Sequence, residues 1–145
     1  MLSRLLATGY SPAIALNSDG PTLAFQNLLC ALERLRDADV VLGPSEDGGY
    51  YLIGLKKAQP GLFQGIDWST KRVTVQTLAR AEDLGLAVAM LPQWYDVDAA
   101  ADLWRLLDDL ARLPGDVAPN ARRCLCGLGV GADRTGTAGP DRRRL

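Results

Sequence analysis

Short apolar runs alternate with longer amphipathic segments along this chain, and the alternation constrains its fold more than any other feature. Each apolar run is bounded by residues that form turns, which is typical of strands buried in a sheet. Each amphipathic segment repeats apolar residues at helical spacing, which is typical of a helix with one buried face. The apolar runs are residues 13–16, 40–42, 50–55 and 87–91, and the amphipathic segments are residues 22–36, 70–84 and 99–113. The pattern predicts an α/β fold in which helices pack on the faces of a sheet.

Leucines dominate the expected buried faces of the first and the last of these helices. In each helix four leucines recur at a spacing that places them on one side, while charged residues fall elsewhere. The first set is Leu28, Leu29, Leu32 and Leu35, and the second set is Leu103, Leu106, Leu107 and Leu110.

The chain divides into a mildly acidic body and a basic, glycine-rich tail. Residues 1–121 carry 10 basic and 15 acidic side chains, whereas residues 122–145 carry 6 basic and 2 acidic ones. The acidic body argues against a nucleic-acid-binding surface. The tail is expected to be a flexible, solvated end, although its arginines could also contact nucleic acid or anionic lipid. We predict one α/β domain over residues 1–121 and a flexible tail over residues 122–145.

Composition excludes several kinds of catalytic and metal site. The 145 residues include no histidine, which excludes Ser-His-Asp and Cys-His catalysis, a histidine base and histidine-ligated zinc. The three cysteines are too few for a disulfide framework and lack the spacing of a zinc site. No apolar run reaches the length of about 18 residues that a membrane helix needs, and the first residues do not resemble a signal peptide. We expect a cytoplasmic protein with no membrane partner.

Asp19 is the first residue in the chain that we consider as a possible metal ligand. It lies in the loop directly after the apolar run 13–16, and open α/β sheets bind ligands beyond the carboxyl ends of their strands. A carboxylate there suits a divalent cation shared with substrate phosphates, because magnesium takes few protein ligands. The alternative is that Asp19 only accepts hydrogen bonds from turn amides or from the next helix.

Two carboxylates and two glycines form the loop between the second and third apolar runs. These residues are Glu46, Asp47, Gly48 and Gly49. The glycines permit a positive φ and a close backbone approach by a ligand. The carboxylates could bind sugar hydroxyls, help to hold a cation or act as a base. The alternative is a polar hairpin turn, because Asp-Gly is a common turn pair.

The sequence Trp68, Ser69, Thr70, Lys71 and Arg72 precedes the second expected helix. Ser69 or Thr70 is expected to cap that helix. A helix N-terminus also binds anions, and the two basic side chains could reinforce a phosphate site there. Trp68 either stacks on a sugar or a base, or belongs to the core.

Asp96 and Asp98 lie just before the last expected helix. Their side chains point the same way if the segment is extended. One of them could cap the helix, and the other could complete a metal site with Asp19. Helix capping is the simpler interpretation.

In this order, the four stretches resemble the GT-A-type nucleotide-diphospho-sugar transferase superfamily. More narrowly, the chain is similar to a bacterial family of glycosyltransferases, some of them linked to arsenosugar biosynthesis. The resemblance covers roughly residues 3–123. It rests on NSDGPTL, LGPSEDGGYYLIGL, IDWST, VQTLARAEDLGL, YDVDAAADLWRLL and APNARR.

The resemblance implies a Rossmann-like, three-layer α/β/α fold that transfers a sugar from a nucleotide-diphospho-sugar donor to an acceptor. It implies Mg²⁺ or Mn²⁺ as cofactor, with Asp19 and Asp98 as ligands. It places Glu46 and Asp47 near the donor sugar or the acceptor, as the catalytic residues. Together with the loop chemistry above, it makes Gly48, Gly49, Trp68, Ser69 and Thr70 the predicted substrate-binding residues.

Two departures from the family pattern keep other functions open. Family members begin with a strand and a basic, glycine-containing loop that grips the nucleotide, and this sequence is expected to start after that region. Asp98 is followed by three alanines where relatives tend to have Thr-Pro and an acid, so we expect a looser site. The alternatives are a nucleotidyltransferase of the same fold, or a truncated, non-catalytic remnant. A remnant would expose a sheet edge and associate with a partner or as a homo-oligomer.

Overall fold

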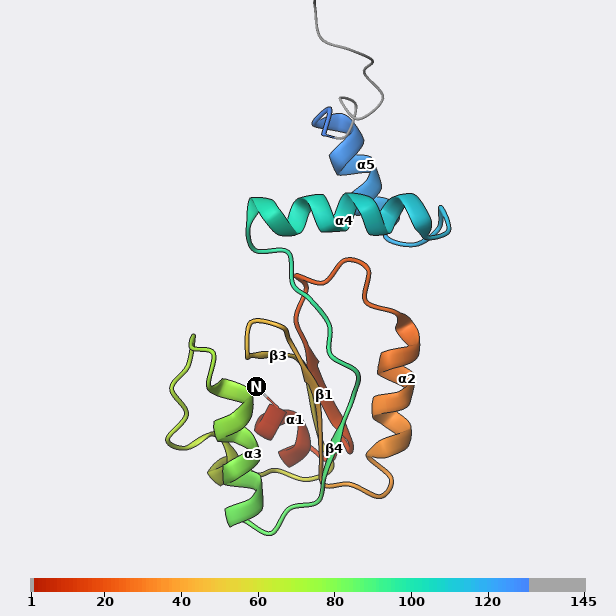
Figure 1. Ribbon diagram of the computed structural model, residues 1–145. Helices are drawn as coiled ribbons and strands as arrows, with labels where there is room; N and C mark the ends of the chain where they lie inside the picture. The colour runs from red at the N-terminus through yellow and green to blue at the C-terminus, as the bar shows by residue number, and fades with distance from the viewer. Residues whose placement is uncertain (1, 131–145) are drawn as a thin grey trace, which may run out of the picture.

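The computed structural model describes residues 2–130, which form a sheet with flanking helices and a C-terminal helix pair (Figure 1). The strands are β1 (Ala13–Leu16), β2 (Val40–Pro44), β3 (Tyr50–Leu55) and β4 (Val88–Met90). The helices are α1 (Leu2–Ala7), α2 (Phe25–Arg34), the short 3₁₀ helix η1 (Pro60–Phe63), α3 (Val73–Asp83), α4 (Ala100–Arg112) and α5 (Pro119–Gly127). The predicted alternation of strands and helices is confirmed.

The four strands form one mixed sheet in the order β1-β3-β2-β4. β3 lies between β1 and β2 and is antiparallel to both, whereas β2 and β4 are parallel. The β2–β3 pair is a hairpin, so its connection can be short, whereas the chain between the parallel strands β2 and β4 runs through β3, η1 and α3.

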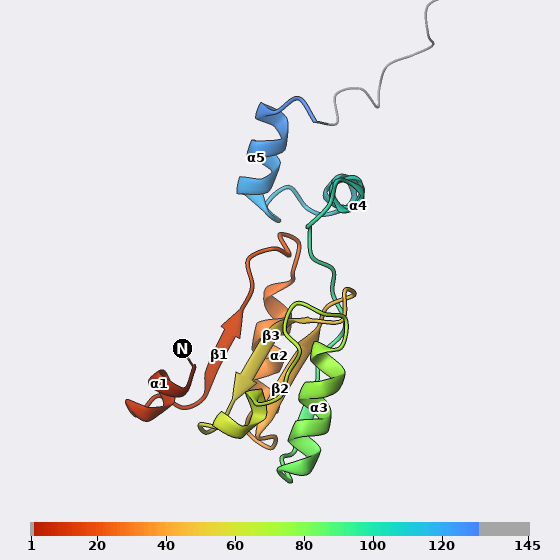
Figure 2. The ribbon, with the colours of Figure 1, turned by 90° about the vertical axis from the view of Figure 1, so that its left-hand side faces the viewer.

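Helices cover both faces of this sheet because side chains alternate between the faces along each strand. On one face, Ala31 and Leu35 of the α2 segment pack against Val41, Tyr51 and Leu52. The opposite face is covered by α3, η1 and α1. Its core contains Val40, Leu42, Ile53, Leu55, Leu62 and Ala81. Figures 1 and 2 show α2 on one side of the strands and α3 on the other.

The predicted buried face of the first helix needs a correction. Leu35 is buried, but Leu29 and Leu32 are 37% and 43% exposed. Leu28, Ala31 and Leu35 lie three and four residues apart, so these side chains line up along one helical stripe. Leu29 and Leu32 fall beside that stripe, where the sheet does not reach them.

The C-terminal helices α4 and α5 form a small core of their own. Leu106 and Leu110 of α4 are buried against Leu125 of α5, and Leu103 and Leu107 pack at their margin. The predicted leucine face of α4 is therefore confirmed. α5 continues through Gly127, beyond the end of the domain predicted at residue 121. Most of the predicted tail, residues 131–145, lies outside the described residues.

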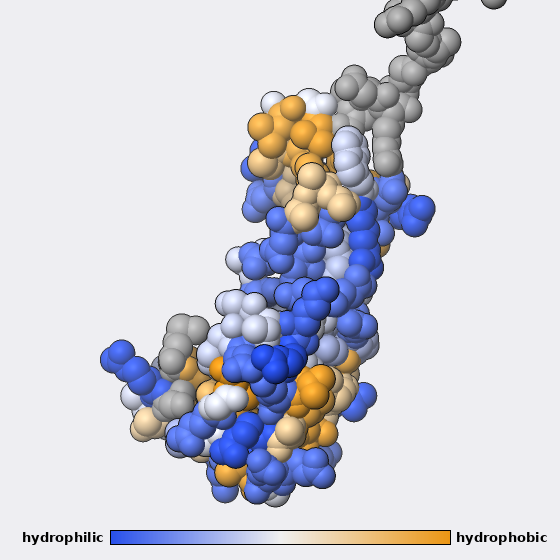
Figure 3. Space-filling model, turned by 60° about the vertical axis from the view of Figure 1, so that its left-hand side comes forward, coloured by the Kyte–Doolittle hydropathy of each residue, from blue (hydrophilic) through white to orange (hydrophobic). Residues whose placement is uncertain are grey.

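Hydrophilic side chains cover most of the face seen in Figure 3. Apolar side chains gather at the end that holds the C-terminal helices and on the lower part of the sheet domain. Within residues 2–130, no helix is both long and apolar enough to cross a membrane.

Candidate functional site

Three loops that carry predicted site residues meet at one edge of the sheet. β1, β2 and β4 all point the same way, because β2 is parallel to β4 and both β1 and β2 are antiparallel to β3. The loops after these three strands therefore leave the sheet at the same edge, which lies next to α4 (Figure 1). The loop after β1 contains Asp19, the loop after β2 contains residues 46–49, and the loop after β4 contains Asp98.

Backbone hydrogen bonds hold these three loops together. The amide of Val97 donates to the carbonyl of Asp19 at 2.8 Å, which joins the first loop to the third. The amide of Glu46 donates to the carbonyl of Trp94 at 3.0 Å, which joins the second loop to the third. The three loops therefore form one connected structure at this edge of the sheet.

Carboxylates are crowded where the first and third loops meet. Desolvation, followed by the negative charges of Asp96, Asp19 and Asp47, raises the pKa of Asp98 above its ordinary value. The part of this shift that comes from neighbouring carboxylates reflects repulsion between negative charges, which a cation at this place would relieve. The predicted metal ligands Asp19 and Asp98 are thus electrostatically coupled.

Asn17 adds an unpaired oxygen to the acidic loops. Its Nδ2 donates to Oδ1 of Asp96 at 2.8 Å, while its own Oδ1 is buried and has no hydrogen-bond partner among residues 2–130. The opposite orientation of the amide would set two oxygens against each other, so the contact with Asp96 fixes the side chain as it stands. Such a buried oxygen can accept a hydrogen bond from a water or a ligand, or contact a cation.

The last helix is capped differently from the prediction. The Asp102 carboxylate, in the first turn of α4, accepts hydrogen bonds from the amides of Ala99 and Asp98 at 2.9 and 3.2 Å. Ala99 is the N-cap residue, so the interpretation of Asp96 or Asp98 as the cap is wrong. The Asp102 carboxylate thus bonds back to the N-cap amide, as the acidic residue of a capping box does, and Asp98 lies one residue before the N-cap position.

Glu46 is held by a residue that the sequence did not indicate. Two nitrogens of Arg105, on α4, donate to the two carboxylate oxygens of Glu46 at 2.6 and 3.0 Å. The Arg105 guanidinium also lies 3.9 Å from the centre of the Tyr95 ring. These hydrogen bonds and the charge of Arg105 lower the pKa of Glu46 below its ordinary value of 4.5. A carboxylate so stabilised in its ionised form is a weak base.

Replacing Arg105 with glutamine should lower the free energy of unfolding by about 0.2–1 kcal/mol at pH 7, the range of a solvent-exposed ion pair. Because the folded-state pKa of Glu46 is lowered, this stabilisation is present above pH 4.5 and is lost as the pH falls through the lowered pKa. Urea denaturation of both proteins across this pH range measures the difference. Arg112→Gln, at an exposed position later in α4, is the control. The same pH dependence in both variants would contradict the assignment.

The glycine loop packs against the segment before α3. Gly48 has a φ of +93°, and a Cβ at this position would lie 2.6 Å from the Cα of Lys71. The carbonyl of Gly48 accepts a hydrogen bond from the amide of Thr74 at 3.0 Å, and the Thr74 hydroxyl donates to the carbonyl of Gly49. Only glycine combines this conformation with such close backbone contact. The hairpin alternative is thus correct for the topology, and the loop also lines a cavity.

A cavity of about 570 Å³ lies between the glycine loop and the segment before α3. Its wall contains most of the predicted catalytic and substrate-binding residues of both segments. The residues from these segments are Asp47, Gly49, Trp68, Ser69, Thr70 and Lys71. Trp68 is 52% exposed, so the alternative that it belongs to the core is wrong. The cavity combines an aromatic ring, hydroxyls, a cation and a carboxylate.

Ser69 and Thr70 do not cap α3 as predicted. The helix begins at Val73, and its N-cap residue, Arg72, makes no side-chain capping bond. Thr70 donates to the carbonyl of Asp67 at 2.7 Å, and Ser69 has a φ of +60°. The chain turns once more before the helix starts, which leaves both residues at the cavity wall, with the Thr70 hydroxyl also accepting from the amide of Arg72 at 3.3 Å. Arg72 pairs with Asp67 at 2.8 Å, so Lys71 is the basic side chain at the cavity wall.

Among the described residues, no group of three or more histidine, cysteine or acidic side chains is placed to bind a metal by itself. A cation at Asp19 and Asp98 would therefore need oxygen ligands from water or from a bound phosphate. Magnesium sites commonly have this composition, with one or two carboxylates from the protein.

Parts of this sequence and this fold are similar to those of known bacterial proteins. Residues 1–70 match the family described as "Uncharacterized protein conserved in bacteria (DUF2064)". The fold is similar to a crystal structure from Desulfovibrio desulfuricans G20, described as a "putative nucleotide-diphospho-sugar transferase", with 30% sequence identity and a TM-score of 0.76. No curated protein matches the chain. The similarity covers 86% of this chain and 56% of that one, so the chain spans little more than half the length of its relative. This similarity supports the predicted resemblance to nucleotide-diphospho-sugar transferases.

Proposed function

We propose that this chain contributes the metal-binding and sugar-binding side of a glycosyltransferase that uses a nucleotide-diphospho-sugar donor. One observation carries the proposal: the loops after β1, β2 and β4 converge and bring Asp19, Asp98 and Asp47 to one edge of the sheet. Ligands bind at this edge in open α/β sheets. The similarity to the Desulfovibrio protein supports the same function, and with it a Rossmann-like GT-A fold.

The residues present fit a divalent cation. Asp19 and Asp98 would hold it, because they follow β1 and β4 at the same sheet edge and their charges interact. The unpaired Oδ1 of Asn17 could also contact the cation. When bound, Mg²⁺ or Mn²⁺ would neutralise charge on the donor diphosphate, so that the nucleoside diphosphate can leave.

The cavity beside Asp47 has groups suited to a glycosyl diphosphate. The indole of Trp68 would stack on an apolar face of the sugar, and the Ser69 and Thr70 hydroxyls would hydrogen-bond to its hydroxyls. The Lys71 ammonium would pair with a phosphate oxygen. These contacts would position the anomeric carbon of the sugar for attack.

The transfer requires one base. The acceptor oxygen forms a bond to the anomeric carbon while the bond from that carbon to the phosphate oxygen breaks, and the nucleoside diphosphate leaves with the bonding electrons. The proton of the acceptor hydroxyl would pass to Asp47, which lines the cavity. For Glu46, the other predicted catalytic residue, the pairing with Arg105 favours a positioning role, because this contact ties the loop to α4.

A thermal-shift experiment on the wild-type chain tests the proposal. UDP-, GDP-, dTDP- and CDP-glucose are added with Mn²⁺, and matched samples contain EDTA. A donor at 100 times its Kd should stabilise the native state by about 2.7 kcal/mol, which raises the Tm by several degrees. We expect this with one nucleotide and only with the metal. The free nucleosides are the control, and a cooperative melt that no donor changes would contradict the proposal.

A further inference from the structure

The two walls of the cavity beside Asp47 are anchored to the same helix, α3. Thr74, in the first turn of this helix, bonds to the carbonyls of the glycine loop, which forms one wall. Two residues later, Gln76 bonds to Asp67, the residue directly before Trp68 on the other wall. The start of α3 therefore sets where the proposed base lies relative to the indole.

Gln76 forms two hydrogen bonds with Asp67 through the two ends of its amide. Its Oε1 accepts from the backbone amide of Asp67 at 2.9 Å, and its Nε2 donates to Oδ2 of the Asp67 carboxylate, also at 2.9 Å. The opposite orientation of the amide would set donor against donor and oxygen against oxygen, so the two contacts fix the side chain. Gln76 thus ties the segment before α3 to the helix at a defined position.

Asp67 connects this pair to the rest of the cavity wall. Its carbonyl accepts from the Thr70 hydroxyl at 2.7 Å, and its Oδ2 also pairs with Arg72 at 2.8 Å. Between these contacts Ser69 has a φ of +60°, which is uncommon for a residue with a side chain and persists only where the surroundings hold it. The contacts of Asp67 therefore brace the turn that carries Trp68.

One aromatic contact supports the Trp68 ring itself. The centre of the ring lies 6.3 Å from that of Phe63, with an angle of 30° between the planes. Phe63 belongs to η1 and packs against the core on the α3 side of the sheet. Phe63 constrains the indole, and the contacts of Asp67 constrain the backbone that carries it. Because Trp68 remains 52% exposed, part of the indole is free to receive a sugar.

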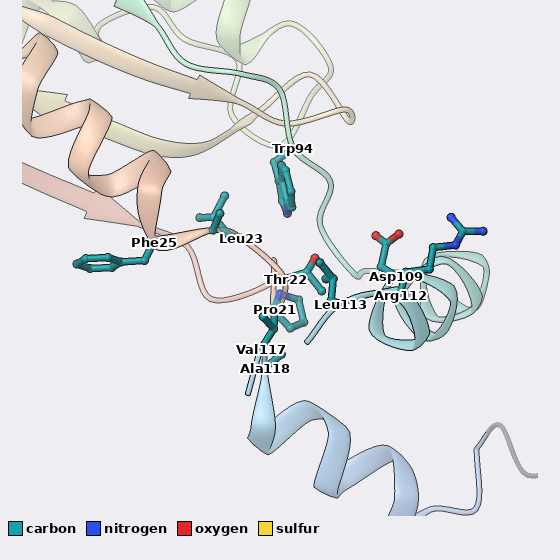
Figure 4. Close-up of a pocket in the computed structure, with 11 residues that line it drawn as sticks. Pro21, Thr22, Leu23, Phe25, Trp94, Asp109, Arg112, Leu113, Val117 and Ala118 are labelled. Atoms are coloured by element: carbon teal, nitrogen blue, oxygen red, sulfur yellow. The ribbon is translucent and has the colours of Figure 1, made fainter. Parts of the chain in front are cut away.

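Figure 4 shows a second cavity, of about 540 Å³, between residues 21–25 and the end of α4. Trp94 and Leu113 lie on its walls. Among the described residues, it shares no lining residue with the cavity beside Asp47. A sugar bound there would not reach Asp47, so the residues that position the sugar belong to the first cavity and to the elements that hold its walls.

We infer that Gln76 is a positioning residue, which acts through Asp67 to keep the Trp68 indole across the cavity from Asp47. The inference rests on the proposed function, since it concerns how that site receives the sugar of the donor. Gln76 is not among the residues that line the cavity, so its effect must pass through the wall that it holds. Such an effect is expected to be large, because a displacement of about 1 Å in a positioning group can cost about 100-fold in rate.

Gln76→Met tests this role, because it keeps the length of the side chain and removes both hydrogen bonds. We expect it to weaken binding of the donor in Mn²⁺ at least fivefold, as measured by titration calorimetry. Gln26→Met, at an exposed position in the first turn of α2, is the matched control and should leave binding unchanged. Circular dichroism confirms that both variants remain folded. Equal donor affinity of the two folded variants would overturn the inference.

A reversed pair tests whether the contact with Asp67 is the cause. In the double variant Asp67→Asn with Gln76→Glu, the new amide can donate to the new carboxylate, which still accepts from the backbone amide of residue 67. Donor affinity should return to within threefold of the wild-type value. Binding by the double variant that is as weak as that of Gln76→Met would overturn the assignment of Asp67 as the link.

A double-mutant cycle with Trp68→Ala separates positioning of the indole from a general loss of structure. If Gln76 acts through the indole, Gln76→Met should weaken donor binding less than twofold once Trp68 is already alanine. The same substitution should cost at least fivefold in the wild-type chain. Equal losses in the two backgrounds would overturn the inference, because they would show that Gln76 acts on some other part of the site.

A measurement without ligand separates this inference from the proposed function. The indole ¹⁵N–¹H resonance of Trp68, identified by its absence in Trp68→Ala, should move in Gln76→Met and stay in place in Gln26→Met. An unmoved resonance in Gln76→Met, or donor binding that Gln76→Met leaves intact, would overturn this inference alone. If no donor bound to the wild-type chain, the proposed function would fail and the role of Gln76 in sugar binding would fail with it.

Discussion

Replacing Asp19 with asparagine is expected to abolish the metal-dependent binding of a nucleotide-sugar donor. The change keeps the size of the side chain but removes one of two carboxylates that would hold the cation. Loss of several kcal/mol of charge stabilisation corresponds to a decrease in donor affinity of about 100-fold or more. Titration calorimetry with the donor in Mn²⁺ measures the loss, and transferase activity should fall at least as much.

Asp37→Asn is the matched control for Asp19→Asn. Asp37 is exposed and precedes β2, so it lies at the opposite edge of the sheet from the three loops. Both variants lose one negative charge, which makes the general change in the electrostatic field comparable. If the two variants bound the donor equally well, the assignment of Asp19 as a metal ligand would be wrong.

Gly48→Ala should cause a large loss of stability, about 3 kcal/mol of the free energy of unfolding. A side chain at a positive φ costs about 1–2 kcal/mol, and overlap with the backbone of Lys71 adds a cost of similar size. The loop must move away from α3 to relieve the overlap, so the cavity beside Asp47 should also change shape. Urea denaturation measures the first effect, and donor titration measures the second.

Gly65→Ala separates the two causes. Gly65 also has a positive φ, +72°, but apart from its chain neighbours a Cβ there would have no atom of the described residues within 4 Å. This variant should lose only the conformational cost of about 1–2 kcal/mol and should bind the donor normally. Equal destabilisation by both substitutions would show that the contact with Lys71 contributes nothing.

Periodicity was sufficient to place the main elements, because helices and strands depend largely on which neighbouring residues are apolar. The four predicted strands and the helices that correspond to α2, α3 and α4 are all present. Loop chemistry led to the prediction of a ligand site in the polar loops, and the structure brings Asp47, Gly49, Trp68, Ser69 and Thr70 to one cavity. Ligand binding there stays a prediction.

Local sequence was misleading for the first residues of α3 and α4, where the side chains predicted to cap the helices do not do so. Ser69 and Thr70 are good capping residues, yet the turn at Asp67 uses Thr70 and delays the start of α3. Asp98 was a reasonable cap for α4, but the N-cap residue is Ala99, and Asp102 in the first turn accepts from the amides of Asp98 and Ala99. In both cases the start of the helix depends on local hydrogen bonds that the residue type alone does not predict.

By itself, the sequence determined the α/β class, the order of the elements and the polar loops at the strand ends. Only the tertiary structure decided that β3 inserts between β1 and β2, and that three of these loops share an edge. It also decided the pairing of Glu46 with Arg105, which are 59 residues apart, and of Asn17 with Asp96, which are 79 residues apart. The physical reason is that periodicity reports the surroundings of a residue along its own helix or strand. The partner of a charged or polar side chain depends instead on how distant elements pack, and a short stretch of sequence does not contain that information.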